Sequence, residues 1–178
     1  QFEWYGQTYN ATVAKKIPPA QADIALLRFT PWRDDLPCVY VDVDVQPLHS
    51  VYTYGYPENF SRGVSATGQF DGPGTDDDGS GFLAFSRMQV RPGRSGSPLL
   101  NLDTGCVCGI IKFTNEKTGN FGGGAVPTAE IKKHLPEVAD LQAAFHQRSS
   151  LWKNLLPKAS AYEDLQSRRK SSSQIVEC

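Results

Sequence analysis

The residues best suited to chemistry in this 178-residue chain lie between Gly93 and Pro98, which read Gly-Arg-Ser-Gly-Ser-Pro. Glycines on both sides let the backbone turn sharply and leave main-chain N–H groups pointing outward. Such groups, most simply those of Gly93 and Ser95, can hold the oxyanion that forms when a hydroxyl attacks a carbonyl carbon. Ser95 is therefore a candidate nucleophile, and Gly93 and Ser95 form a candidate oxyanion hole. The alternative is an ordinary turn between two strands.

A carboxylate, Asp23, stands at the head of an apolar run that begins at Ile24. We expect the run to draw this carboxylate toward the interior, where it needs a hydrogen-bonding partner. In a serine hydrolase that partner is the N–H of a histidine, which the carboxylate orients while the histidine takes the serine proton. The alternative interpretation of Asp23 is a turn residue that starts a strand.

Together, Asp-Ile-Ala-Leu-Leu from Asp23 and Gly-Arg-Ser-Gly-Ser-Pro-Leu-Leu-Asn from Gly93 resemble the trypsin-like serine peptidase family, and the order of Asp before Ser fits. The resemblance continues in Gly105–Ile111, which is similar to the strand after the nucleophile loop, and in Gly122–Pro127, which is similar to the strand behind the substrate pocket. Tyr54–Pro57 is similar to a turn of bacterial members. The joint pattern is more specific than any of its parts.

The resemblance implies a mainly β fold, a chymotrypsin-like double antiparallel β-barrel with C-terminal helices. It implies a serine endopeptidase that hydrolyses peptide bonds through an acyl-enzyme, with Ser95 as nucleophile and Asp23 orienting a histidine. In this family the pocket for the substrate side chain before the scissile bond is shaped by the residue about six positions before the nucleophile, here Gln89. The strands near Phe113 and Gly123 complete that pocket. No cofactor is implied.

The catalytic histidine is missing from its expected place. In the family it precedes the aspartate, whereas His49 follows Asp23, and His134 and His146 fall in a polar region with helical character. Either the histidine-bearing strands lie upstream of Gln1 and the first barrel is incomplete here, or the domain has lost its base. A start without methionine, inside a hairpin pattern, favours the first interpretation, and we expect the chain alone to be inactive.

Two other classes of function stay open. One is a catalytically silent trypsin-fold module that binds a peptide by strand addition, and the other is a structural domain that docks a partner through its C-terminal helices. Similar bacterial domains are often fused to signalling modules. The resemblance therefore implies the proteolytic effector part of a larger bacterial protein, with a protein or peptide substrate and a fused or associated signalling module.

Composition excludes several classes of partner. The net charge of −1 provides no basic field for nucleic acid. No apolar stretch approaches the roughly 18 residues that would cross a bilayer, so we expect no membrane insertion. The four cysteines are few for a disulfide framework, and Cys108 lies in an apolar run typical of a core strand. We therefore expect a reducing cytoplasm.

Short segments bounded by Gly, Pro and Asp predict strands. They span residues 8–13, 24–29, 39–43, 50–54, 64–69, 82–88, 98–101, 107–114 and 122–126. Residues 31–37 are expected to separate the two barrels. The loop Asp71–Gly81 carries four carboxylates but lacks the ligand spacing of an EF-hand, so we expect a solvated, mobile loop and assign no metal.

After Pro127 the pattern becomes helical, with Thr128 as a candidate cap and a break expected at Pro136. The apolar residues that recur at helical spacing are Ile131, Leu135, Val138, Leu141 and Phe145. A second amphipathic segment is predicted over 150–156. The organisation expected is an N-terminally truncated peptidase domain over 1–135, a helical segment over 136–157 and a polar linker or tail over 158–178.

Substrate preference gives the first prediction. Gln89 is neutral, so the pocket lacks the acidic floor that draws Arg or Lys, and we predict a small or apolar side chain before the scissile bond. A peptide-library cleavage profile measures this preference, with Ser95→Ala as the control for contaminating activity. Dominant cleavage after Arg or Lys would contradict the prediction.

Overall fold

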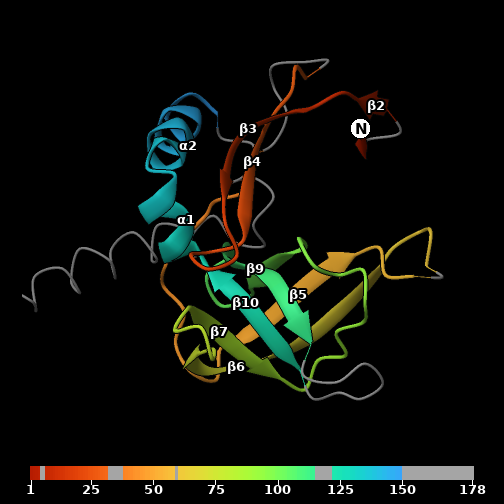
Figure 1. Ribbon diagram of the computed structural model, residues 1–178, viewed down its shortest axis with the longest axis vertical. Coiled ribbons are helices and arrows are strands. Elements are labelled where there is room, and N and C mark those ends of the chain that lie inside the picture. Colours follow the sequence, from red (N-terminus) through yellow and green to blue (C-terminus); the bar gives the residue numbers. More distant parts are fainter. Residues whose placement is uncertain (5–6, 32–37, 59, 115–121, 150–178) are drawn as a thin grey trace, which may run out of the picture.

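The computed structural model describes residues 1–4, 7–31, 38–58, 60–114 and 122–149, and the chain is mainly antiparallel β (Figure 1). Its strands are β1 (Phe2–Trp4), β2 (Gln7–Tyr9), β3 (Thr12–Ile17), β4 (Ile24–Arg28), β5 (Ser50–Gly55), β6 (Val64–Thr75), β7 (Gly81–Ser86), β8 (Pro98–Asn101), β9 (Cys106–Thr114) and β10 (Gly123–Pro127). Two helices follow, α1 (Thr128–His134) and α2 (Glu137–Arg148). Strands β5 to β10 close into a barrel in the order β10-β7-β6-β5-β8-β9, while β1–β2 and β3–β4 form separate antiparallel pairs.

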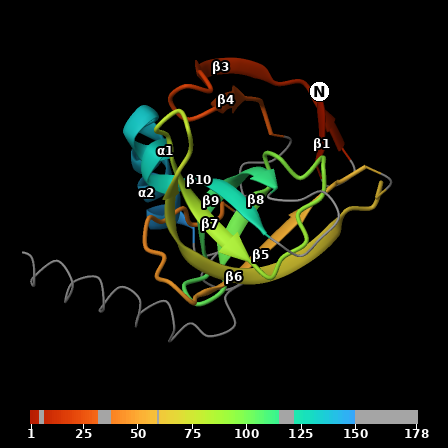
Figure 2. The ribbon, with the colours of Figure 1, turned by 60° about the horizontal axis from the view of Figure 1, so that its bottom comes forward.

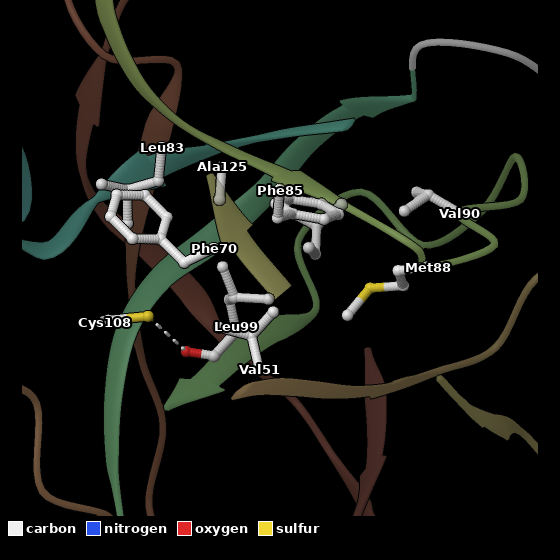
Figure 3. Packing of buried hydrophobic residues seen from close by; sticks show 10 residues of the cluster. Val51, Phe70, Leu83, Phe85, Met88, Val90, Leu99, Cys108 and Ala125 are labelled. Atoms are coloured by element: carbon white, nitrogen blue, oxygen red, sulfur yellow. Dashed lines mark hydrogen bonds between the residues drawn. The ribbon is translucent and has the colours of Figure 1, made fainter. Parts of the chain in front are cut away.

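The interior of the barrel is filled by alternate side chains from every strand. The buried cluster contains Val51, Phe70, Leu83, Phe85, Met88, Val90, Leu99, Cys108, Ile111 and Ala125 (Figure 3). Cys108 belongs to this core, as its apolar surroundings in the sequence predict, and its thiol donates to the Leu99 carbonyl at 3.4 Å. Burial raises the pKa of Cys108 to about 12, so this thiol stays protonated and serves as a packing group.

A second buried cluster attaches the β3–β4 hairpin to the barrel. Ile17, Ala22 and Ile24 of the hairpin pack with Val126 of β10 and with residues of α1. Figures 1 and 2 accordingly show the hairpin on one side of the barrel with α1 beside it. Two other hydrophobic residues of the hairpin, Val13 and Leu27, are 50% and 51% exposed. The expected mainly β, chymotrypsin-like architecture is confirmed, with one closed barrel and two separate two-stranded sheets.

Most expected strands agree with the structure to within a few residues, although 8–13 divides into β2 and β3. The strand expected over 39–43 is wrong, because only a single parallel bridge from Val41 to Val107 forms there. The physical reason is competition from α2. The Gln142 side-chain amide accepts from Val41 N at 2.6 Å and donates to Val41 O at 3.1 Å, and so takes both backbone groups that a neighbouring strand would use.

The mobile loop expected over 71–81 is also wrong. Strand β6 continues to Thr75 and pairs with β7, so only residues 76–80 form a turn. A bulge between Phe70 and Gly72 absorbs one residue of register, and the Phe82 ring lies where a side chain on Gly74 would be. The Gly and Pro residues that indicate a loop in the sequence therefore sit at a bulge and beneath an aromatic ring.

The helix break expected at Pro136 is confirmed, because α1 ends at His134 and Pro136 precedes α2. Thr128 is not a cap. It is the first residue of α1, and its hydroxyl donates to the Val107 carbonyl at 3.2 Å. Leu141, expected on the apolar face, is 67% exposed because α2 begins anew after Pro136 and turns Gln142 inward instead. Neither described helix is long and apolar enough to span a membrane. The predictions for 32–37, 150–156 and 158–178 concern residues outside those that the structure describes.

The close approach of β10 to β7 gives the second prediction. Gly122 has φ +72°, and a Cβ there would lie 1.7 Å from the Phe85 carbonyl oxygen. We expect Gly122→Ala to lower the free energy of unfolding by about 3 kcal/mol or more, from the left-handed backbone and from the clash. Gly79→Ala is the matched control, because Gly79 has φ +80° and no atom within 4 Å of its Cβ position. It should cost about 1–2 kcal/mol, the backbone strain alone. If urea unfolding gives the same loss of free energy for both variants, the backbone at Gly122 does not lie tightly against Phe85.

Candidate active site

Ser95 lies exposed in a tight double turn between β7 and β8. Arg94 N donates to the Arg91 carbonyl at 3.2 Å, and Ser97 N donates to the Arg94 carbonyl at 3.0 Å. Gly93 and Gly96 make these turns possible with φ of +89° and +88°. The turn is anchored to β9 by two backbone hydrogen bonds of 2.9 Å, from Gly96 N to Ile111 O and from Ile111 N to Ser97 O.

The two amides expected to form the oxyanion hole are uncommitted. Within the described residues, neither Gly93 N nor Ser95 N donates a hydrogen bond. Their loop is held against the turn after β5, where a Cβ on Gly93 would come within 3.0 Å of Pro57 Cα. The left-handed conformation and the close approach both require glycine at position 93. An exposed hydroxyl and two unused backbone donors therefore occur in one rigid turn.

The Ser95 hydroxyl donates to the Lys112 carbonyl at 3.1 Å. The sequence gives no indication of this contact, because a backbone acceptor carries no residue signature. In the described part of the chain no imidazole bonds to Ser95. Loss of the Ser95 proton to a base thus requires the hydroxyl to turn away from β9.

His49 lies at the opposite end of β5 and β8 from Ser95. Its Nδ1 accepts from Gln46 N at 3.3 Å and lies 3.0 Å from the Asn101 side-chain nitrogen. Gly55, at the far end of β5, is the residue that approaches the Ser95 loop. Six residues of strand between His49 and Gly55 correspond to about 20 Å. His49 is therefore far outside hydrogen-bonding range of Ser95.

The other two histidines belong to the helices. His134 Nε2 lies 3.3 Å from a Glu130 carboxylate oxygen one turn earlier in α1. The His146 ring stacks on Tyr40, with 4.8 Å between ring centroids. Both side chains thus have partners other than Ser95.

Asp23 is exposed, so the expectation that it is drawn to the interior is wrong. It occupies the last position of the turn between β3 and β4 with φ +52°, and its N–H donates to the Pro18 carbonyl at 3.2 Å. Ala22 and Ile24 on either side take the buried positions, and the left-handed backbone turns the carboxylate outward. Asp23 lines a hollow of about 490 Å³ together with Lys16, Ile17, Pro18, Pro19, Ile24 and Ala25.

Strand β9 links the segments that carry the two candidate catalytic residues. Ile24, next to Asp23, belongs to the buried cluster against which Ile110 packs, and Ser95 bonds to the carbonyl of Lys112. Ile110 and Lys112 are two residues apart, which is about 7 Å along a strand. Both segments are thus fixed to one short stretch of β9. No hydrogen bond joins Asp23 to Ser95 within the described residues.

Gln89, expected to shape the substrate pocket, is paired with a cation. Its side-chain carbonyl accepts from Arg91 Nε at 3.2 Å and from Arg91 Nη2 at 2.9 Å. The Arg91 guanidinium also lies over the Phe60 ring, 5.0 Å from its centroid. This fixed positive charge was missed from the sequence, where only the spacing of Gln89 and Arg91 pointed to it.

Phe113 and Gly123 lie on paired strands. Gly123 of β10 is buried and lies opposite Phe85 of β7. The Phe113 ring extends over Gly124, where a Cβ would come within 2.3 Å of it, and meets the Phe82 ring edge-on at 5.1 Å. Phe113 is therefore half-buried by packing on the barrel, with Gly124 providing the room.

Lys112 connects the Ser95 turn to the β6–β7 turn. Its ammonium lies 3.1 Å from an Asp76 carboxylate oxygen, while its carbonyl receives the Ser95 hydroxyl. Asp76 also accepts the Ser80 N–H at 2.8 Å. The backbone hydrogen bond from Ser80 is the main cause that lowers the pKa of Asp76, and Lys112 lowers it further.

Comparison with known proteins identifies the class. Over residues 2–110, a span that includes Asp23 and Ser95, the chain matches the family model described as "Trypsin-like peptidase domain", and it belongs to that family. The predicted membership of the trypsin-like serine peptidases is thereby confirmed. No curated protein matches the chain.

Two solved structures share the fold. One is Rv3671c from M. tuberculosis H37Rv, an inactive form of a serine-to-alanine mutant, with 21% identity and a TM-score of 0.54 over 74% of this chain and 66% of that one. The other is a serine-to-alanine variant of the HtrA-type protease AlgW with a tripeptide, with 19% identity and a TM-score of 0.56 over 67% of this chain and 40% of that one. The chain thus spans less than two thirds of the length of each.

The contacts of Asp76 give the third prediction. Because the Ser80 amide is the first cause of its lowered pKa, Lys112→Met should raise the pKa of Asp76 only in part and leave it below the ordinary value of about 4. Ionised Asp76 therefore stabilises the fold above that pH, and the contribution is lost as the pH falls through the lowered pKa. Carboxyl NMR titration measures the shift, with the exposed Lys16→Met as the control. A complete return to the ordinary value would assign the effect to Lys112.

Proposed function

We propose that this chain carries the nucleophile of a serine endopeptidase. The observation that carries the proposal is the exposed Ser95 hydroxyl in a turn whose Gly93 and Ser95 amides have no other partner. Backbone donors fixed before the reaction stabilise developing negative charge without reorganisation. Membership of the trypsin-like peptidase family supports this assignment.

In the proposed reaction a histidine base removes the proton from Ser95 Oγ, which attacks the carbonyl carbon of the peptide bond. The Gly93 and Ser95 amides hold the oxyanion. The intermediate then expels the amine, which takes the proton from the histidine, and leaves an acyl ester on Ser95. Water activated by the same base hydrolyses the ester and restores the hydroxyl.

The base is proposed to come from a segment of the larger protein beyond these 178 residues. His49, His134 and His146 are held by Asn101, Glu130 and Tyr40. The exposed carboxylate of Asp23 has no hydrogen-bonding partner among the described residues and is free to accept the N–H of an incoming imidazole. Burial by that segment would strengthen the pairing.

The substrate is proposed to be a protein or peptide with a small or apolar residue before the scissile bond. The guanidinium of Arg91 on Gln89 places a positive charge at the residue expected to form the pocket floor. Like charge disfavours a substrate Arg or Lys there. We also propose that Phe113 and Gly123 line this pocket. The chain is further proposed to belong to a larger bacterial protein with a signalling module and to act in the cytoplasm.

A second candidate function is a silent peptide-binding module. The observation that favours it is the hydrogen bond from the Ser95 hydroxyl to the Lys112 carbonyl, because no base among the described residues bonds to this hydroxyl. In this case a peptide would bind in the same cleft by strand addition.

Activity gives the fourth prediction. Without its base the oxyanion hole should leave a rate only about 10³ to 10⁴ above water, so the 178-residue chain should be close to inactive. Adding the histidine-bearing segment, in cis or as a fragment, should restore Ser95-dependent hydrolysis and labelling by a fluorophosphonate. Ser95→Ala should abolish both, and Ser61→Ala, at another exposed serine, should abolish neither.

Two outcomes would contradict the proposal. If the isolated chain cleaves peptides at ordinary enzyme rates through Ser95, the base lies within it, and variants of the three histidines would identify it. If the added segment restores folding, measured by thermal unfolding, without hydrolysis or labelling, the chain is a silent binding module.

A further inference from the structure

The residue before the candidate nucleophile is a buried arginine. The Arg94 side chain is 2% exposed and is the largest fully buried side chain of the described residues. Its Nη2 donates to the Ser65 carbonyl at 3.3 Å, while Nε and Nη1 have no hydrogen-bonding partner. An arginine presents five N–H donors and stays charged under all ordinary conditions, so most of its donors are unsatisfied here.

The surroundings of this guanidinium explain how it fits inside the barrel. Arg94 Cγ lies 3.6 Å from the Cβ position of Gly55, so the absence of a side chain on Gly55 leaves room for the arginine stem. Thr53 points inward from the same face of β5 and is fully buried, and its hydroxyl also has no partner. Two residues of strand separate Thr53 from Gly55, about 7 Å. The unsatisfied donors of Thr53 on β5 and of Arg94 in the Ser95 turn thus lie at the same end of the barrel interior.

Among the described residues no carboxylate balances the charge. Within the described residues, the salt bridges formed by carboxylates involve Lys112, Lys133 and His134, and none involves Arg94. Burial lowers the pKa of Arg94, and the positive charge of nearby Arg91 lowers it further. A buried charge without a partner is strongly unfavourable, whereas a charge paired with an anion is tolerated.

We propose that Arg94 and Thr53 form a buried anion site beneath the Ser95 turn, which takes one small monovalent anion of the size of chloride or a single carboxylate group. The guanidinium offers the N–H groups of Nε and Nη1 and the charge, and the hydroxyl offers one further donor. Arg94 lies between Gly93 and Ser95 in the chain, so the bound anion fixes the turn that presents their amides. The site does not depend on the chemistry of Ser95, and its test needs no substrate.

Three variants of the full chain test the charge. Arg94→Met keeps the volume but removes the charge, Arg94→Lys keeps the charge, and Arg62→Met is the control at an exposed arginine. Removing the charge abolishes anion binding and the stability that binding adds, so in saturating sodium chloride Arg94→Met should unfold at a lower temperature than Arg94→Lys. Arg62→Met should unfold with the wild type. If in saturating sodium chloride Arg94→Met is as stable as the wild type or more stable, or if it matches a destabilised Arg94→Lys in every salt, the charge has no partner and the proposal is wrong.

Two salts at equal ionic strength then test whether a free anion from solution occupies the site. Sodium chloride supplies a small anion, and sodium gluconate supplies one too bulky for the interior. With a free anion, the wild type should gain roughly 5 °C or more in melting temperature at 100 times the chloride Kd, and Arg94→Met should gain nothing. Thr53→Val should raise the Kd for chloride about tenfold. If chloride raises the melting temperature of the wild type no more than gluconate does, no free anion binds at Arg94 and the proposal is wrong.

Discussion

The hydrogen bonding of strand β9 to the Ser95 turn is the interaction on which the rest of the structure depends. Ile111 exchanges backbone bonds with Gly96 and Ser97 on one edge of β9, and the next carbonyl, that of Lys112, receives the Ser95 hydroxyl. The same strand closes the barrel with β8 and β10 and buries Ile111 in its core. A shift of β9 by one residue would exchange its inner and outer side chains and detach the turn. Core packing thereby sets the position of the candidate nucleophile.

The end of the barrel beneath this turn is polar, unlike the rest of its interior. Toward the middle, Val51 packs with Phe70 and Leu99, but the next inward positions of β5 are Thr53 and Gly55, and Arg94 enters above Gly55. Apolar side chains would fill this end without the cost of desolvating a charged guanidinium. The guanidinium instead bonds to β6 through Ser65 and so ties the turn to a third strand. Among the described residues this is the only hydrogen bond of the guanidinium, so this end of the barrel holds buried polar groups without partners.

The sequence predicts those parts of the fold that local patterns of apolar residues determine. Alternating and continuous apolar runs predicted β5, β8 and the core role of Cys108, because burial of those side chains decides the structure. Gly74, in a stretch typical of a loop, was misjudged because its strand role depends on the Phe82 ring of another strand. Gln142 displaced an expected strand through contacts with residues about a hundred positions away. Such long-range competition leaves no local pattern.

The candidate site shows the same division. Residue types indicated Ser95 and Gly93, because a turn with two glycines expresses its geometry locally, whereas the outward carboxylate of Asp23 depends on a left-handed turn that the sequence did not reveal. The proposed oxyanion donors, Gly93 N and Ser95 N, need only one turn of backbone held by one barrel, so a single segment can supply both. The proton relay needs side chains from separate segments, whose packing must meet at a single point. The described residues show this difference. The Gly93 and Ser95 amides are without partners in one turn, whereas the Ser95 hydroxyl bonds to the Lys112 carbonyl.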